Sequence, residues 1–112
     1  MNKNFISLIT SSPILGEHPT LDVRQNTLGA ITWSNPDDGV IVGYGVGLFP
    51  ENATTIELKY QSGNGIAPVT NGWGWARNSD DQITILTDGL NGQLNNHLLI
   101  ITVLERVINY TA

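Results

Sequence analysis

The chain has 112 residues, with ten acidic and five basic side chains that give a formal net charge of −5 at pH 7. This length fits one domain around one core, and 40% hydrophobic with 13% charged residues is a globular rather than a disordered composition. The basic residues are scattered, whereas nucleic acid requires a concentrated basic surface, so no nucleic-acid partner is expected. Cysteine is absent, which excludes disulfides, thiolate catalysis and cysteine metal sites.

No stretch of the sequence approaches the roughly 18 consecutive apolar residues of a membrane span. The apolar run at residues 5–9 is too short and too polar for the core of a secretion signal. We therefore expect a soluble single domain over residues 1–112, with no membrane partner.

The region around the first tryptophan predicts a strand and a turn. Residues 20–28 mix polar and apolar side chains without a period, so we expect a partly extended, irregular connection there. In residues 30–34, Ile31 and Trp33 share one face of a half-buried strand. The Asn-Pro-Asp-Asp-Gly run at 35–39 then predicts a turn, because proline presets φ and glycine can take a positive φ.

Residues 40–49 predict a strand with glycine at positions 43, 45 and 47, so one of its faces carries only hydrogens. Glycine inside a strand usually marks a bulge or the close approach of another group. We expect a large group on that bare face, either from a neighbouring subunit or from Trp33, Trp73 or Trp75 of the same chain. A phosphate cradle is the alternative, but the spacing is not that of a dinucleotide site and no Lys-Ser/Thr follows.

The clearest amphipathic strand covers residues 54–60. Ile56 and Leu58 point to one face, whereas Glu57 and Lys59 point to the other. One side of the sheet that contains this strand is therefore expected to face water.

The most apolar stretch is residues 98–108, in which Thr102 is the only polar side chain before Glu105. Its β-branched residues favour a strand, since branching at Cβ suits a pleated surface. A helix that begins at Asn96 is the competing interpretation, but its apolar stripe would be interrupted by Glu105. A strand with two apolar faces requires another layer on each side, and we expect a second copy of the chain to supply one of them.

The chain thus contains six or seven short β segments separated by Gly, Pro, Asn and Asp turns, and no convincing helix. Two further strands are predicted at residues 4–9 and 82–87. A turn is predicted at residues 76–81, between the tryptophan segment and the second of these strands. This pattern predicts an all-β fold, an antiparallel β-sandwich that is jelly-roll-like.

Acidic clusters offer a possible calcium site. Asp pairs at 37–38 and 80–81, with Asp88 and Asn91, carry the oxygens that calcium prefers. Asp and Asn are equally common in turns, because their side chains bond their own backbone, and turn chemistry is the simpler interpretation. We expect no metal and no cofactor.

A catalytic constellation is not apparent. Glu57 and Glu105 are the acids inside predicted strands, and a glycosidase needs two facing carboxyls, but both are more simply solvent-facing charges. His18 and His97 lie apart, without a partner motif for a metal site or a triad. We therefore expect that the protein is not an enzyme.

The best candidate for recognition is the segment that carries Trp73, Trp75, Arg77 and Asn78. Aromatic faces stack on sugar rings, while Arg and Asn can bond hydroxyl groups, and loops on rigid sandwiches often bind ligands. The alternative is that both tryptophans pack into the core or into a subunit interface. Glycan binding at these four residues is the hypothesis that they support.

Several short motifs in the first half of the chain form a pattern. The run from Asn26 to Trp33, then Gly39, the strand with Tyr44, and Phe-Pro-Glu-Asn at 49–52 are similar to small β-rich proteins encoded among virion genes of tailed phages and prophages. The resemblance covers roughly residues 1–60 and transfers no site residue. Where that pattern has a lysine, Ala53 stands here.

The resemblance implies a structural role on a phage particle, as a capsid decoration, head-fibre or tail-associated module. The expected localisation is therefore the virion, and the expected partners are a capsid or tail protein and other copies of the chain, with a homotrimer as the form that suits a spike. A small lectin that uses Trp73 and Trp75 is the alternative.

Overall fold

The computed structural model describes residues 2–10, 17–37, 39–59, 74–87 and 97–105. These residues form eight strands and no helix. The strands are β1 (Lys3–Thr10), β2 (Thr20–Asn26), β3 (Thr32–Asp37), β4 (Val40–Tyr44), β5 (Thr54–Lys59), β6 (Gly74–Ser79), β7 (Gln82–Leu86) and β8 (His97–Val103).

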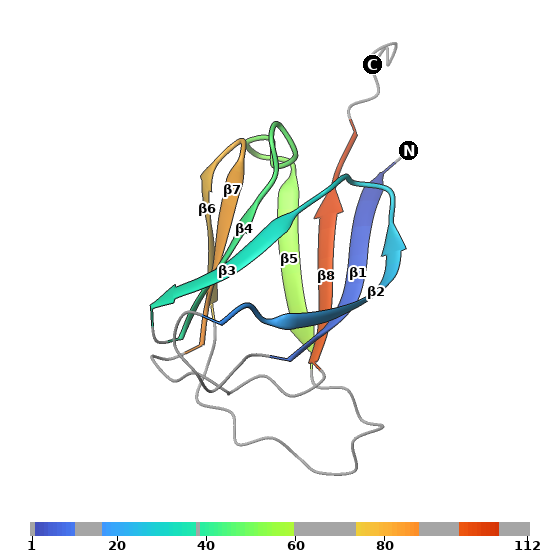
Figure 1. Ribbon diagram of the computed structural model, residues 1–112. Helices are drawn as coiled ribbons and strands as arrows, with labels where there is room; N and C mark the ends of the chain where they lie inside the picture. The colour runs from blue at the N-terminus through green and yellow to red at the C-terminus, as the bar shows by residue number, and fades with distance from the viewer. Residues whose placement is uncertain (1, 11–16, 38, 60–73, 88–96, 106–112) are drawn as a thin grey trace, which may run out of the picture.

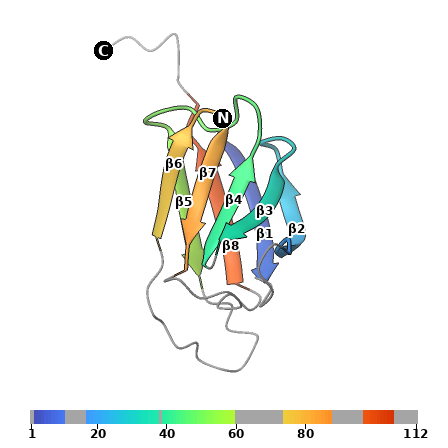
Figure 2. The same cartoon turned by 60° about the vertical axis from the view of Figure 1, so that its left-hand side comes forward.

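The strands form two antiparallel sheets that pack face to face (Figure 1). Sheet A has the order β2-β1-β8-β5, and sheet B has the order β3-β4-β7-β6, which lies toward the viewer in Figure 2. Strands β1–β2, β3–β4 and β6–β7 pair as neighbours along the chain, whereas the β1–β8, β4–β7 and β5–β8 pairs join strands that are distant in sequence. The predicted all-β sandwich is confirmed.

Alternate residues of the central strands supply the core between the sheets. Leu99 and Ile101 of β8 and Ile83 and Ile85 of β7 are fully buried, as expected when period-2 strands present every second side chain to the opposite sheet. Removal of this apolar surface from water is the main favourable term in folding.

The closing stretch is a strand over His97–Val103, so the helical alternative is wrong. Strand β8 lies between β1 and β5, and its inner side chains are covered by sheet B. Residues 106–108 of the predicted strand lie outside the described residues. The outer side chains Leu98 and Ile100 remain partly exposed.

Strand β2 corrects the prediction of an irregular connection. It pairs with β1 at the edge of sheet A, and all but one of its residues are exposed, the exception being Leu21. A strand that buries almost nothing shows no apolar alternation, which is why its sequence gave no signal. A bulge opposite Ile6 and Ser7 adds one residue to β2.

Two predicted element ends also shift. Strand β3 runs to Asp37 and includes Pro36, which an edge strand tolerates because its free side needs no ladder N–H. Strand β6 runs to Ser79, so the turn predicted at 76–81 is confined to the two residues before β7.

Strand β4 ends at Tyr44 rather than at residue 49. The N–H of Leu48 donates to the carbonyl oxygen of Gly45 at 3.2 Å, and Gly47 has a φ of 70°, so this glycine-rich stretch turns. The expected large group is present at Gly43, which is buried beneath the indole of Trp33.

Candidate functional site

The tryptophan segment predicted for recognition is only partly described. Trp73 lies outside the described residues. Trp75 stands opposite Ile85 in the β6–β7 register and packs, partly buried, against the hydrophobic core. Its indole therefore contributes to the interior of the sandwich, in line with the core-packing alternative.

Arg77 is held by internal hydrogen bonds. Its Nε donates to the carbonyl oxygen of Phe49 at 2.7 Å, and its terminal nitrogen pairs with the carboxylate of Asp80. The N–H of Phe49 donates in turn to the carbonyl oxygen of Asp80 at 2.8 Å. The Arg77 side chain, which is 23% exposed, thus joins the stretch after β4 to the β6–β7 hairpin.

Asn78 lies apart from the side chains of Trp75 and Arg77. It is exposed at the bulge in β6, and its Oδ1 accepts a hydrogen bond from Thr84 Oγ1 at 2.5 Å. Thr84 alternates with the buried Ile83 and Ile85, so this bond places Asn78 on the outer face of sheet B. Among the described members of the predicted site, the structure brings no exposed aromatic face beside Asn78.

The acids of the β6–β7 turn are used locally. The Oδ1 of Asp81 accepts the N–H of Gly47 at 2.7 Å, while Asp80 pairs with Arg77. Within the described ranges, no three His, Cys, Asp or Glu side chains are grouped to hold a metal ion. The other acids and amide of the predicted calcium site, Asp38, Asp88 and Asn91, lie outside those ranges.

The two glutamates weighed as a glycosidase pair each lie beside a lysine. Glu57 is 3.2 Å from the ammonium of Lys59, and Glu105 is 3.8 Å from that of Lys3. All four side chains are substantially exposed. These contacts fit the simpler interpretation of solvent-facing charges.

The most distinctive surface is the outer face of sheet A, the side turned away from sheet B. Ile6 stands opposite Ile100, and Leu8 stands opposite Leu98, across the β1–β8 pair. Side chains directly opposite each other in a sheet share a face and touch. These four partly exposed side chains form a contiguous apolar patch on the two central strands.

Charged residues frame the apolar patch on the two edge strands. On β2, Asp22 stands opposite Leu8, and the guanidinium of Arg24 lies 2.8 Å from its carboxylate. On β5, Glu57 stands opposite Ile100, and Lys59 stands opposite Leu98. All four charged side chains are more than half exposed.

The four charges alternate in sign around the apolar patch. Level with Leu8 and Leu98, the β2 edge carries the acid Asp22 and the β5 edge carries the base Lys59. Toward the two isoleucines, the β2 edge carries the base Arg24 and the β5 edge carries the acid Glu57. Arg24 lies near the level of Ile6 because it is the extra residue of the β2 bulge, next to Gln25, which stands opposite Ile6. We call this arrangement the charge frame.

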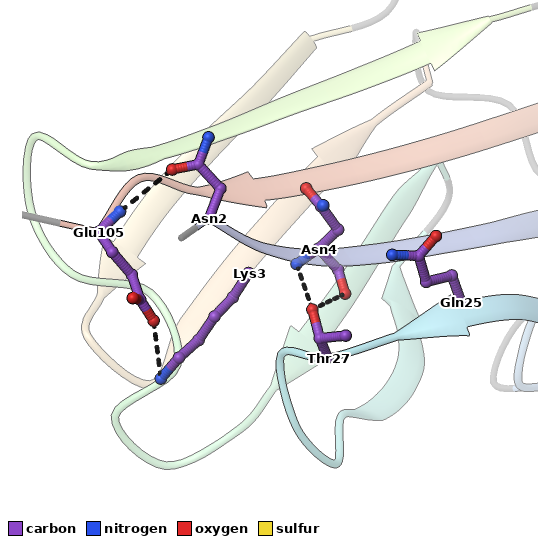
Figure 3. A pocket seen from close by; sticks show the side chains of 6 residues that line it. All are labelled: Asn2, Lys3, Asn4, Gln25, Thr27 and Glu105. Carbon is purple, nitrogen blue, oxygen red and sulfur yellow. Dashed lines mark hydrogen bonds and ion pairs between the residues drawn. The ribbon is translucent and has the colours of Figure 1, made fainter.

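A shallow groove of about 270 Å³ lies where β1 begins (Figure 3). Its residues are polar, but carbon atoms supply most of its surface. It is lined by Asn2, Lys3, Asn4, Gln25, Thr27 and Glu105. The backbone N–H of Asn4 donates to Thr27 Oγ1 at 2.9 Å, and the backbone N–H of Glu105 donates to Asn2 Oδ1 at 3.4 Å. Several of the polar groups that line the groove are therefore bonded to one another.

The sequence indicated half of this surface. The alternation in residues 54–60 placed Glu57 and Lys59 on a solvent-facing side, and that placement is confirmed. Asp22 and Arg24 were missed because their strand was not expected. The signal that points to the apolar patch is the absence of polar residues on either face of residues 98–101.

Comparison of the chain with models of protein families, with curated proteins and with solved structures finds no match. Among the described residues, no helix is of the length and hydrophobicity needed to cross a membrane.

Proposed function

We propose that the protein is a non-enzymatic structural component of a phage virion, a capsid decoration, head-fibre or tail-associated module that works as a homo-oligomer. The observation that carries the assembly role is the outer face of sheet A, where an apolar patch is set inside a frame of exposed charges. Contiguous apolar surface with a polar rim is typical of interaction sites. The resemblance of residues 1–60 to virion-associated proteins supports the location.

Two of the four edge strands of the sandwich carry features that oppose pairing with another chain. Strand β2 is polar and bulged, and β3 carries proline, and both features discourage uncontrolled pairing at sheet edges. Strands β2 and β3 are therefore not expected to pair with a second copy of the chain. A trimer remains the prediction made from the sequence alone.

Quantitative mass spectrometry of purified particles tests the virion role. The expected result is that the chain is present in a fixed ratio to the major capsid or tail proteins and stays bound through a density gradient. A chain that is abundant in the infected or induced lysate but missing from gradient-purified particles would contradict the proposal.

Glycan binding is the second candidate function, and the groove where β1 begins favours it. Its amides, hydroxyl, ammonium and carboxylate are the groups that bond sugar hydroxyls. A glycan array followed by calorimetry tests this role with two variants, Gln25→Ala in the groove and Asn78→Ala in the originally predicted site. Loss of binding in one variant assigns the site, whereas no binding by the unmodified chain contradicts the lectin role.

A further inference from the structure

We propose that the outer face of sheet A binds the same face of a second copy of this chain, about a two-fold axis that lies between the two faces. The proposal deepens the homo-oligomeric part of the proposed function, because it names the surface and the partner. It also favours two-fold pairing over the three-fold closure expected from the sequence.

The apolar patch is the centre of this contact. Ile6, Leu8, Leu98 and Ile100 come from the two central strands and are partly exposed in a single chain. A face-to-face pair would place the patch of one copy on the patch of the other and remove both from water.

The charge frame selects a second copy as the occupant. If the two-fold axis runs along the strands, Asp22 of one copy lies over the partner's Lys59, and Arg24 lies over the partner's Glu57. These pairs follow because the β2 edge of one copy then covers the β5 edge of the other at the same level. Every overlap joins opposite charges.

The same result holds if the axis runs across the strands. Asp22 then lies over the partner's Arg24, and Glu57 lies over the partner's Lys59, because the two levels of the frame are exchanged. A surface whose charges alternate in this way is complementary to itself in both face-to-face arrangements. Like charges placed opposite each other would instead oppose association.

The size of the face predicts a weak complex. Four strands about 4.8 Å apart, each about seven residues long at about 3.3 Å per residue, give a face of roughly 440 Å² per copy, or about 900 Å² for the pair. Specific complexes usually bury about 1,200–2,000 Å² in total. We therefore expect a reversible dimer with a dissociation constant in the micromolar range.

Sedimentation equilibrium of the full chain over a range of concentrations tests the pairing. The expected result is a mass that rises from one copy to two. Ile100→Glu would bury an unpaired charge at the centre of the contact and weaken the dimer by about tenfold or more. Val46→Glu is the control, since Val46 is 75% exposed and lies outside sheet A, and it should leave the dissociation constant unchanged.

Charge reversal on β5 gives a second test of the dimer, and it changes only exposed side chains. Lys59→Glu places an acid over an acid in either arrangement, so it should weaken the dimer severalfold at low salt. Asp22→Lys combined with Lys59→Glu restores the affinity if the axis runs along the strands. Glu57→Lys combined with Lys59→Glu restores it if the axis runs across them. Both double variants keep the net charge at its original value.

Restoration by either double variant supports the two-fold contact. A chain that stays monomeric at high concentration, a trimer, or a dimer that tolerates Ile100→Glu would overturn it. These failures differ from failure of the proposed function, because a monomer found in purified particles keeps the virion role, while a dimer absent from particles keeps the contact.

Discussion

Trp33 and Gly43 stand opposite each other across the β3–β4 pair, and the indole occupies the space that any side chain at position 43 would need. A Cβ on Gly43 would lie 2.9 Å from Cζ3 of Trp33. The same indole reaches across the sandwich to Phe5 of sheet A, with ring centroids 5.9 Å apart. The glycine therefore allows an aromatic contact between the two sheets.

Gly43→Ala is expected to destabilise the fold by about 1–3 kcal/mol, because the added methyl group overpacks against the indole. Urea denaturation followed by tryptophan fluorescence measures the change. Gly74→Ala is the matched control, since no atom lies within 4 Å of its added Cβ, and it should shift the free energy of unfolding by less than about 1 kcal/mol. Equal costs at the two positions would contradict this account of Gly43.

Arg77→Ala is expected to lower the free energy of unfolding by about 1–3 kcal/mol. The substitution leaves the buried carbonyl of Phe49 without its donor and removes the pairing with Asp80. Asn78→Ala, which removes one exposed hydrogen bond, should cost less than about 1 kcal/mol. If Arg77→Ala left stability unchanged and instead abolished ligand binding, the recognition role predicted from the sequence would be favoured over the structural one.

Asn35 holds the β3–β4 connection from the inside. Its Nδ2 donates to the carbonyl oxygens of Asp37 at 3.0 Å and Val40 at 2.6 Å, and the side chain is buried. Asn35→Ala should cost about 1–3 kcal/mol through the two unsatisfied carbonyls. At neutral pH, Asn35→Asp should cost more, because a carboxylate would face both carbonyl oxygens without a donor. Chemical denaturation of the two variants measures their free energies of unfolding. A larger loss from Asn35→Ala than from Asn35→Asp would contradict this geometry.

The neighbouring leucines of β8, Leu98 and Leu99, are expected to contribute differently to stability and to self-association. Leu99 is 0% exposed, so Leu99→Ala should destabilise the chain by about 2–5 kcal/mol. Leu98 lies on the outer face, so Leu98→Ala should cost less in unfolding free energy but weaken self-association. Thermal unfolding and sedimentation of the same two variants test this division. A larger loss of stability from Leu98→Ala would show that the outer face is already covered within one chain.

The sequence predicted those elements whose two faces differ in polarity or whose two faces are both apolar. Strand β5 was recognisable because its polar and apolar residues alternate, and β8 because it is apolar on both sides. Strand β2 was missed because its exposed position leaves no burial pattern in its residues. Pro36 was taken as the end of a strand, although an edge strand accommodates it.

The candidate site was harder to predict than the fold. The role of Arg77 depends on the carbonyl of Phe49, a residue 28 positions away, and sequence spacing gives no information on that contact. Trp75 could be assigned to core or surface only once its partner Ile85 was known. The charge frame likewise joins β2 and β5, which are held at opposite edges of sheet A by the two strands between them.

A single cysteine introduced at position 100 tests most directly whether the outer face of sheet A meets its own copy. The chain contains no cysteine, so Ile100→Cys and Val46→Cys each provide one thiol. A short bismaleimide should cross-link Ile100→Cys into a covalent dimer faster than Val46→Cys, although Val46 is the more exposed position. Equal rates, or faster cross-linking at Val46, would contradict the proposed contact.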